Sequence, residues 1–173
     1  GTNQGLSKIN INEFTIEKVN FQNYKAHDGW SFNRIQSLYE DKSGNIWFGT
    51  YGMGANAIIG YHLRNQEPIF IHFSKSDGLI SNRILSIAED LSGNIWFGTD
   101  GDGICILKNS SEFKEKELKL KWSYFNTSDG LVNDVVNTLR RDKKGEIWIG
   151  TNEGINSITE VSRKISIERK EHK

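Results

Sequence analysis

Residues 41–50 read DKSGNIWFGT, a phrase that returns as DLSGNIWFGT at 90–99 and as DKKGEIWIGT at 142–151. A second phrase precedes each copy: DGWSFNRIQSLYE at 28–40, DGLISNRILSIAE at 77–89 and DGLVNDVVNTLRR at 129–141. The tryptophans of the three copies, Trp47, Trp96 and Trp148, are 49 and 52 residues apart. Self-similarity at a period of this length indicates a repeat architecture.

Each unit contains short strand patterns separated by turn residues, without a helical period. We expect a first strand at 35–40, 84–89 and 136–141, a second at 46–49 and its copies, and a third at 55–63, 104–107 and 155–158. A fourth strand precedes each Asp-Gly and carries aromatic residues at matching places: Phe21, Phe70 and Trp122, then Tyr24, Phe73 and Phe125. The first strand does not alternate between apolar and polar residues, so we expect both of its faces to be at least partly covered.

A tight hairpin is expected between the first and second strands. The aspartates at its start can accept backbone N–H bonds across the turn, and a glycine three residues later suits a positive φ. The aspartates are Asp41, Asp90 and Asp142, and the glycines are Gly44, Gly93 and Gly145. The tryptophans of the second strand are wide enough to pack between neighbouring sheets, so Trp47, Trp96 and Trp148 are assigned a structural role.

Four antiparallel strands per repeat are typical of a β-propeller blade. The sequence therefore predicts an all-β fold of three full blades, at 28–76, 77–128 and 129–173, after an outer half blade at 1–27. Closed propellers have about 4–8 blades, and the open sheet edges at either end would otherwise pair with other strands. We therefore expect a fragment of a larger propeller, of about seven blades, with an exchange of strands between chains as the alternative.

Composition excludes several classes of partner. The 22 Lys and Arg balance the 22 Asp and Glu and are scattered, which argues against nucleic acid or an anionic membrane surface as the main partner. No apolar run approaches the ~20 residues of a membrane-spanning helix. Cys105 is the only cysteine, so neither an internal disulfide nor a cysteine-based metal site is expected.

The paired phrases resemble the two-component regulator propeller repeats of bacterial hybrid histidine kinases. The resemblance covers nearly the whole chain and implies a periplasmic sensor segment, in a family best known for sensing polysaccharide fragments. Propeller blades in that family precede a β-sandwich, a membrane span and a kinase, none of which is present in these 173 residues. The third unit departs from the phrase, with Asp134 and Val135 where the first two units have Asn33-Arg34 and Asn82-Arg83.

No catalytic constellation is apparent. No metal-ligand spacing links the four histidines, and no serine lies in a nucleophile-elbow context. Asp100 and Asp102 put two carboxylates on one turn, as calcium sites do, but the sequence lacks a matching set of six to eight oxygen ligands. We therefore expect no metal and no cofactor.

Candidate ligand residues follow from propeller geometry. If the first strand is innermost, the loop entering it and the loop from the second to the third strand lie on one face around the central channel. Several loop residues are specific to single units, as ligand-facing residues often are: Trp30, Tyr51, Asp100, Asp102 and Glu153. The candidates are Trp30, Asn33, Arg34, Tyr51, Asn82, Arg83, Asp100, Asp102, Asn133, Asp134, Asn152 and Glu153.

The sequence therefore favours a non-enzymatic sensor segment, whose partner is an oligosaccharide, the remaining blades or another copy of the chain. Aromatic rings such as Trp30 and Tyr51 would stack on sugar faces, and the neighbouring polar groups would bind hydroxyls. One alternative is a structural or protein-binding propeller. Another is an enzyme resembling streptogramin lyase, a propeller that uses a histidine and a metal; here the entries to the innermost strands hold Asn, Arg, Asp and Val instead.

Overall fold

The computed structural model of the chain describes residues 1, 5–9, 21–24, 34–60, 69–108, 120–161 and 164–169. Its strands are β1 (Leu6–Ile9), β2 (Phe21–Tyr24), β3 (Ile35–Glu40), β4 (Ile46–Thr50), β5 (Ala55–Ile59), β6 (Ile69–Phe73), β7 (Ile84–Glu89), β8 (Ile95–Thr99), β9 (Ile104–Lys108), β10 (Lys121–Phe125), β11 (Val136–Arg141), β12 (Ile147–Thr151), β13 (Gly154–Val161) and β14 (Lys164–Arg169). Two one-turn helices, η2 (Lys75–Asp77) and η4 (Thr127–Asp129), follow β6 and β10. Among the described residues, no helix is long and apolar enough to span a bilayer.

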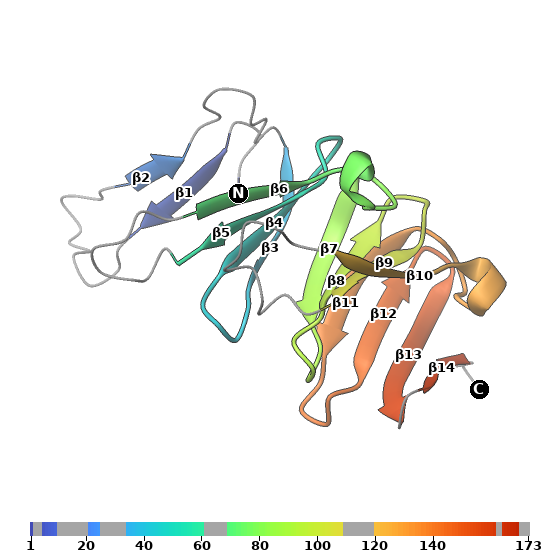
Figure 1. Ribbon diagram of the computed structural model, residues 1–173. Coiled ribbons are helices and arrows are strands. Elements are labelled where there is room, and N and C mark those ends of the chain that lie inside the picture. Colours follow the sequence, from blue (N-terminus) through green and yellow to red (C-terminus); the bar gives the residue numbers. More distant parts are fainter. Residues whose placement is uncertain are drawn as a thin grey trace, which may run out of the picture.

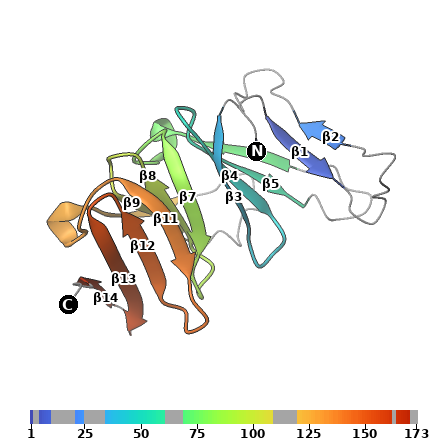
Figure 2. The ribbon, with the colours of Figure 1, turned by 180° about the vertical axis from the view of Figure 1, so that it is seen from behind.

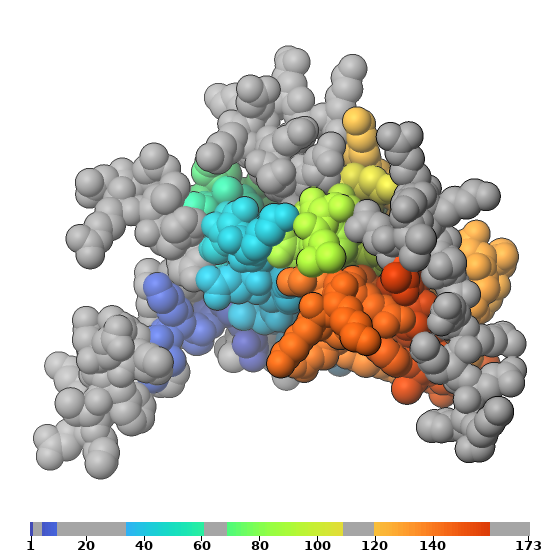
Figure 3. Space-filling view, turned by 90° about the horizontal axis from the view of Figure 1, so that it is seen from below, coloured from blue at the N-terminus to red at the C-terminus, as the bar shows by residue number. Residues whose placement is uncertain are grey.

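Within the described ranges, the strands form three four-stranded antiparallel sheets and one two-stranded sheet. The four-stranded sheets run in the orders β3-β4-β5-β6, β7-β8-β9-β10 and β11-β12-β13-β14, and β1 pairs with β2 alone. Seen from one side and from behind, the sheets fan out in chain order from the blue pair to the red strands (Figures 1 and 2). Seen from below, the cyan, green and orange surfaces follow one another in the same order (Figure 3). This is the expected propeller arrangement of three blades and an outer pair.

The third strands differ from the expected ranges. β5 ends at Ile59 rather than continuing to 63, and residues 61–63 lie outside the described part of the chain. β13 runs from Gly154 to Val161 instead of 155–158, because its pairing with β14 extends to Val161 and Lys164.

Each first strand carries the same irregularity at its start. The pairing with the second strand shifts between Ile35 and Ser37, and again at the corresponding places of β7 and β11. A bulge of this kind breaks the two-residue side-chain period, which explains why the sequence of the first strand does not alternate. The expected cover on both faces is found in β7, where five of six residues are buried, whereas β3 and β11 retain exposed positions.

The Asp of each repeated phrase ties the hairpin to the tryptophan. Asp41 Oδ1 accepts the backbone N–H groups of Ser43 and Asn45, as expected, at 2.9 and 2.8 Å. Its Oδ2 accepts the side-chain amide of Asn45 at 2.9 Å and the indole N–H of Trp47 at 2.8 Å. The indole N–H is thereby satisfied, so the ring can be buried without the cost of an unpaired donor.

The second unit repeats this contact closely, and the third repeats it more loosely. The indole of Trp96 donates to Asp90 at 2.9 Å, and the indole of Trp148 donates to Asp142 at 3.3 Å. One physical requirement, a buried indole with a satisfied N–H, accounts for the spacing of Asp and Trp in all three phrases.

The hydrophobic core lies between consecutive sheets rather than in one central cluster. Trp47 and Phe73 of the first blade pack with Phe97 and Leu107 of the second, with ring centroids of Trp47 and Phe97 6.0 Å apart. Trp96 packs with residues of the second and third blades. A smaller cluster of Leu6, Phe48 and Ile58 joins the outer pair to the first blade. Each blade is therefore stabilised chiefly by its neighbours.

The glycine of each IWFG phrase lies where two neighbouring blades approach each other closely. A Cβ at Gly49 would lie 2.5 Å from Ile84 Cγ2, and a Cβ at Gly98 would lie 2.6 Å from Val136 Cγ1. Gly1 has the same relation to Ile35. Around Gly150, in contrast, such a Cβ would contact only Thr138 of its own sheet.

The outer face of the third blade is accordingly more open than the corresponding faces of the other two. Ile155 is 44% exposed, whereas Ala55 and Ile104 at the corresponding positions are fully buried. Trp148 is only partly buried, whereas Trp47 and Trp96 are buried. No further sheet covers this face among the described residues.

Candidate functional site

The loops that the sequence assigns to one face do lie together. The backbone N–H groups of Gly52 and Gly54, in the β4–β5 loop, donate to the carbonyl of Asn82 in the loop entering β7. Gly101 and Gly103 make the same bonds to the carbonyl of Asp134. The second-to-third loop of each of the first two blades is therefore joined to the entering loop of the next.

Sequence reasoning gave no role to a threonine that shapes these loops. Thr50 Oγ1 donates to the carbonyl of Gly54 at 2.8 Å and accepts the N–H of Met53 at 3.1 Å. Thr99 makes the corresponding bonds in the second blade. The signal was available, because a threonine follows the glycine in all three repeated phrases.

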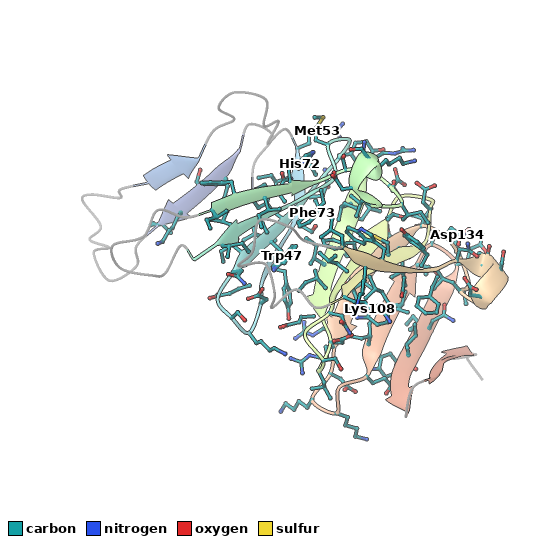
Figure 4. All side chains as sticks on the ribbon, viewed as in Figure 1. Trp47, Met53, His72, Phe73, Lys108 and Asp134 are labelled. Carbon is teal, nitrogen blue, oxygen red and sulfur yellow. The ribbon has the colours of Figure 1, made fainter. Side chains whose placement is uncertain are left out.

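Figure 4 shows Met53 in the β4–β5 loop, and Asp134 beside η4.

Four of the candidate residues form one cluster centred on Tyr51. The Tyr51 hydroxyl donates to Asp100 Oδ2 at 3.0 Å, and Arg83 Nη1 approaches the same oxygen at 2.9 Å. The guanidinium carbons of Arg34 and Arg83 lie 4.7 and 5.6 Å from the centroid of the Tyr51 ring. The cluster joins the first blade, which supplies Arg34 and Tyr51, to the second, which supplies Arg83 and Asp100.

The cluster is open to solvent and charged. The side chain of Arg83 is 50% exposed and that of Asp100 is 24% exposed, so solvent weakens their ion pair. The hydrogen bond to Tyr51 and the negative charge of Asp100 raise the pKa of Arg83 above its ordinary value. Arg83 therefore remains fully charged at any physiological pH.

Asn82 and Asp134 have local roles. The side-chain oxygen of Asn82 accepts the N–H of Lys75 at 3.1 Å. The carboxylate of Asp134 accepts the N–H of Thr127 at 2.8 Å and its hydroxyl at 3.2 Å. Both side chains hold the start of a one-turn helix, which explains why Asn in two units and Asp in the third can occupy the same position.

The remaining described candidates are less tightly grouped. Asn133 accepts the N–H of Val135 at 2.8 Å, and Asn152 accepts the side-chain amide of Asn137 at 2.7 Å. Asp102 is partly buried and Glu153 is exposed. Trp30 and Asn33 lie outside the described residues, so the structure does not place them.

Groups that would support catalysis are not gathered in the part of the chain that the structure describes. No set of three or more His, Cys, Asp or Glu side chains there could hold a metal ion. Cys105 is buried in β9, and desolvation raises the pKa of its thiol to about 12, which suits a core residue rather than a nucleophile. His72 is paired with the side chain of Asn56 at 2.9 Å on an outer strand.

Comparison with known proteins agrees with the repeat. Residues 29–52, 78–101 and 130–153 each match the family described as "Two component regulator propeller". The three units are two-component regulator propeller repeats. Each match covers the entering loop, the first two strands and the start of the next loop, so the family signature coincides with the inner half of each blade.

Solved structures share the fold. The extracellular domain of BT4673, described as a hybrid two-component system from B. thetaiotaomicron, matches with a TM-score of 0.71 and 25% identity over 96% of this chain and 22% of that one. The corresponding domain of BT3049 from the same organism matches with a TM-score of 0.52 and 20% identity over 98% and 26%. A catalytically inactive virginiamycin B lyase from Staphylococcus aureus matches with a TM-score of 0.58 and 14% identity over 97% and 56%. None of the curated proteins matches the chain.

The chain thus spans about a fifth of the length of the extracellular domain of BT4673, in keeping with a part of a larger propeller. Its repeats match the two-component regulator propeller family, and the domain of BT4673 belongs to a protein described as a hybrid two-component system. The resemblance to the lyase shows the fold alone.

Proposed function

We propose that this chain is a non-enzymatic, ligand-sensing part of a periplasmic β-propeller in a bacterial hybrid histidine kinase. An oligosaccharide is the proposed ligand, bound on the loop face. The single observation that supports a ligand site there is the cluster of Arg34, Tyr51, Arg83 and Asp100. The fold does not require this cluster, because the third unit has Val135 and Asn152 at the corresponding places.

The position of the cluster suits a sensor. It connects two blades, so a ligand that binds it favours one relative arrangement of those blades. Signalling of this kind works by a shift in population, and the ligand must prefer one arrangement over the other. We propose that the parent protein passes this shift to its kinase.

The remaining blades are the proposed partners of the outer surfaces. The outer face of the third blade includes Gly150, Trp148 and Ile155. It corresponds to the faces of the first two blades that the next blade covers. We propose that a further blade of the same propeller packs there.

Thermal unfolding of the full chain tests the ligand. A ligand that binds only the folded state stabilises it by RT ln(1 + [L]/Kd), so the melting temperature rises with the logarithm of the ligand concentration above its Kd. A panel of plant and host oligosaccharides should contain one class that raises it. Tyr51→Ala and Trp30→Ala should abolish the rise, while Lys143→Ala, at an exposed position of the β11–β12 hairpin, should leave it unchanged.

A result in which no oligosaccharide changes the melting temperature would favour the structural or protein-binding propeller instead. An effect that persists in Tyr51→Ala would place the ligand elsewhere.

A further inference from the structure

The ring of Tyr51 is already occupied. Sequence reasoning expected this ring to stack on an apolar sugar face, yet the guanidinium groups of Arg34 and Arg83 lie against it, at 4.7 and 5.6 Å from the ring centroid. Guanidinium groups are attracted to the negative face of an aromatic ring. The Tyr51 ring therefore packs against two cations. A ligand at this surface meets the guanidinium N–H donors rather than an open ring.

The two arginines differ in how far neighbouring carboxylates neutralise their charge. Arg83 has a carboxylate at 2.9 Å, that of Asp100, and the charge of Asp102 also acts on it. Arg34 is exposed, and no ion pair involves it among the described residues. The five N–H donors of a guanidinium match a carboxylate or sulfate in two-point geometry. Within the part of the chain that the structure describes, Arg34 is thus the cation of this cluster that has no carboxylate paired with it.

The backbone conformation of Arg34 indicates that the surrounding structure holds this residue in place. Its φ of 58° is the one positive value at a non-glycine residue in the described ranges. Such a conformation is unfavourable for a long side chain, and it persists where the surrounding structure holds it. Arg83, at the same position of the next unit, does not share it.

From these observations we infer that the ligand carries an acidic group, a carboxylate or a sulfate, which binds Arg34 beside the Tyr51 ring. The inference rests on the proposed ligand-sensing function and narrows its ligand to acidic oligosaccharides. The charges of Asp100 and Asp102 act on Arg83 and would repel an acidic group there, so the acid is directed to Arg34 rather than to Arg83.

A matched pair of sugars tests this inference in the full chain at low salt, where charge–charge attraction is least screened. Oligogalacturonate carries free carboxylates, and its methyl ester presents the same sugar without charge. We expect the acid to bind at least about tenfold more tightly than the ester, since charge-assisted hydrogen bonds are the stronger class. Arg34→Gln should remove this difference. Arg140→Gln, which removes an exposed arginine from β11, should preserve it.

Inorganic sulfate gives a readout that does not depend on the sugar. Titration should shift the Nε–H NMR signal of Arg34 with saturation, and the effect on neighbouring signals should disappear in Arg34→Gln. Equal binding of acid and ester would overturn the acidic-group inference and leave the sensor proposal standing. If neither sugar binds, the oligosaccharide proposal fails, and the sulfate titration alone decides: a saturable shift supports an anion site, and no shift overturns it.

Discussion

At the scale of single residues, the repeated aspartate contributes more than a turn. Asp41 accepts four hydrogen bonds, from two backbone N–H groups, an amide and an indole. The indole it holds, that of Trp47, is fully buried. A side chain too short to reach the turn and the indole together would leave buried donors unpaired, which is costly.

Asp41→Ala should therefore lower the free energy of unfolding by about 2–4 kcal/mol, because it leaves several donors unsatisfied at a buried site. Urea unfolding followed by circular dichroism measures the change. Asp142→Ala is the matched control: its indole bond is 3.3 Å long and Trp148 is only partly buried. A loss as large in Asp142→Ala as in Asp41→Ala would show that the hydrogen bonds to the buried indole are unimportant.

Glu89 at the end of β7 is a second residue whose environment has a measurable consequence. Its side chain is 3% exposed, and its Oε2 accepts the backbone N–H of Lys42 at 2.9 Å. Burial raises the pKa of this carboxyl above its ordinary value of about 4.5, and the charge of Asp41 acts in the same direction. The folded state thus holds the proton more tightly than the unfolded state does.

The sign of the pH effect follows from linkage. The contribution of Glu89 to stability is fully present below about pH 4.5 and is lost as pH rises through the raised pKa. Glu89→Gln keeps an acceptor for Lys42 and removes the titration, so the variant should gain stability relative to the wild type as pH increases across this window. Chemical unfolding at a series of pH values measures it.

Glu40→Gln removes an exposed carboxylate from the same strand position of the first blade and serves as the control for Glu89→Gln. The pH-dependent gain in Glu89→Gln should exceed any change in Glu40→Gln. Equal pH profiles for wild type and Glu89→Gln would show that the carboxyl is not destabilised by its burial.

At the scale of elements, the contact between consecutive blades depends on a glycine in the second strand. Gly49 and Gly98 lie where the β-branched first residue of the next blade, Ile84 or Val136, approaches the backbone. Packed interiors tolerate added atoms poorly. The bulge at the start of each first strand lies at the same contact, so strand irregularity and glycine together fix how closely two blades approach.

Gly49→Ala and Gly98→Ala should each destabilise the protein by about 1–3 kcal/mol through overpacking. Gly150→Ala should cost clearly less, because its Cβ would contact only Thr138, an exposed side chain of its own sheet that can rotate. Thermal and urea unfolding of the three variants compare them directly. Equal losses at all three glycines would mean that contact with the next blade does not select this residue.

At the scale of the whole molecule, stability is distributed between neighbours. The hydrophobic clusters lie between consecutive sheets, as in repeat arrays where each unit depends on the next. The third blade packs against the second blade on one face. On its other face, Ile155 is 44% exposed and Trp148 is only partly buried. Trp148, on this open face, is only partly buried, whereas the other two repeated tryptophans are buried.

Extending the chain after Lys173 with a copy of residues 74–128 should bury Trp148. The fluorescence contributed by Trp148, obtained by difference from a Trp148→Phe variant, should shift to shorter wavelength and become less accessible to acrylamide. The free energy of unfolding should rise with the added interface. Gly150→Val in the extended chain should prevent both effects by blocking the approach of the new first strand. Unchanged quenching of Trp148 would show that this face does not accept a blade.

The sequence by itself determined the architecture. Three copies of Asp, Gly and Trp at fixed spacing establish a hairpin and a buried indole. Because these requirements are local, they recur wherever the phrase recurs in the sequence. The same reasoning predicted which loops share a face, because alternating strand directions bring them to one end of each sheet.

Only the tertiary structure decided what the loop residues do. Asn82 and Asp134 each bind the start of a one-turn helix, whereas Arg34, Arg83 and Tyr51 came together from two blades. No local pattern specifies such a cluster, since its members are brought into contact by the packing of separate sheets. For the same reason, the different exposure of Trp148 could not be predicted from a phrase that it shares with Trp47: burial depends on what lies beyond the strand, and the phrase describes only the strand itself.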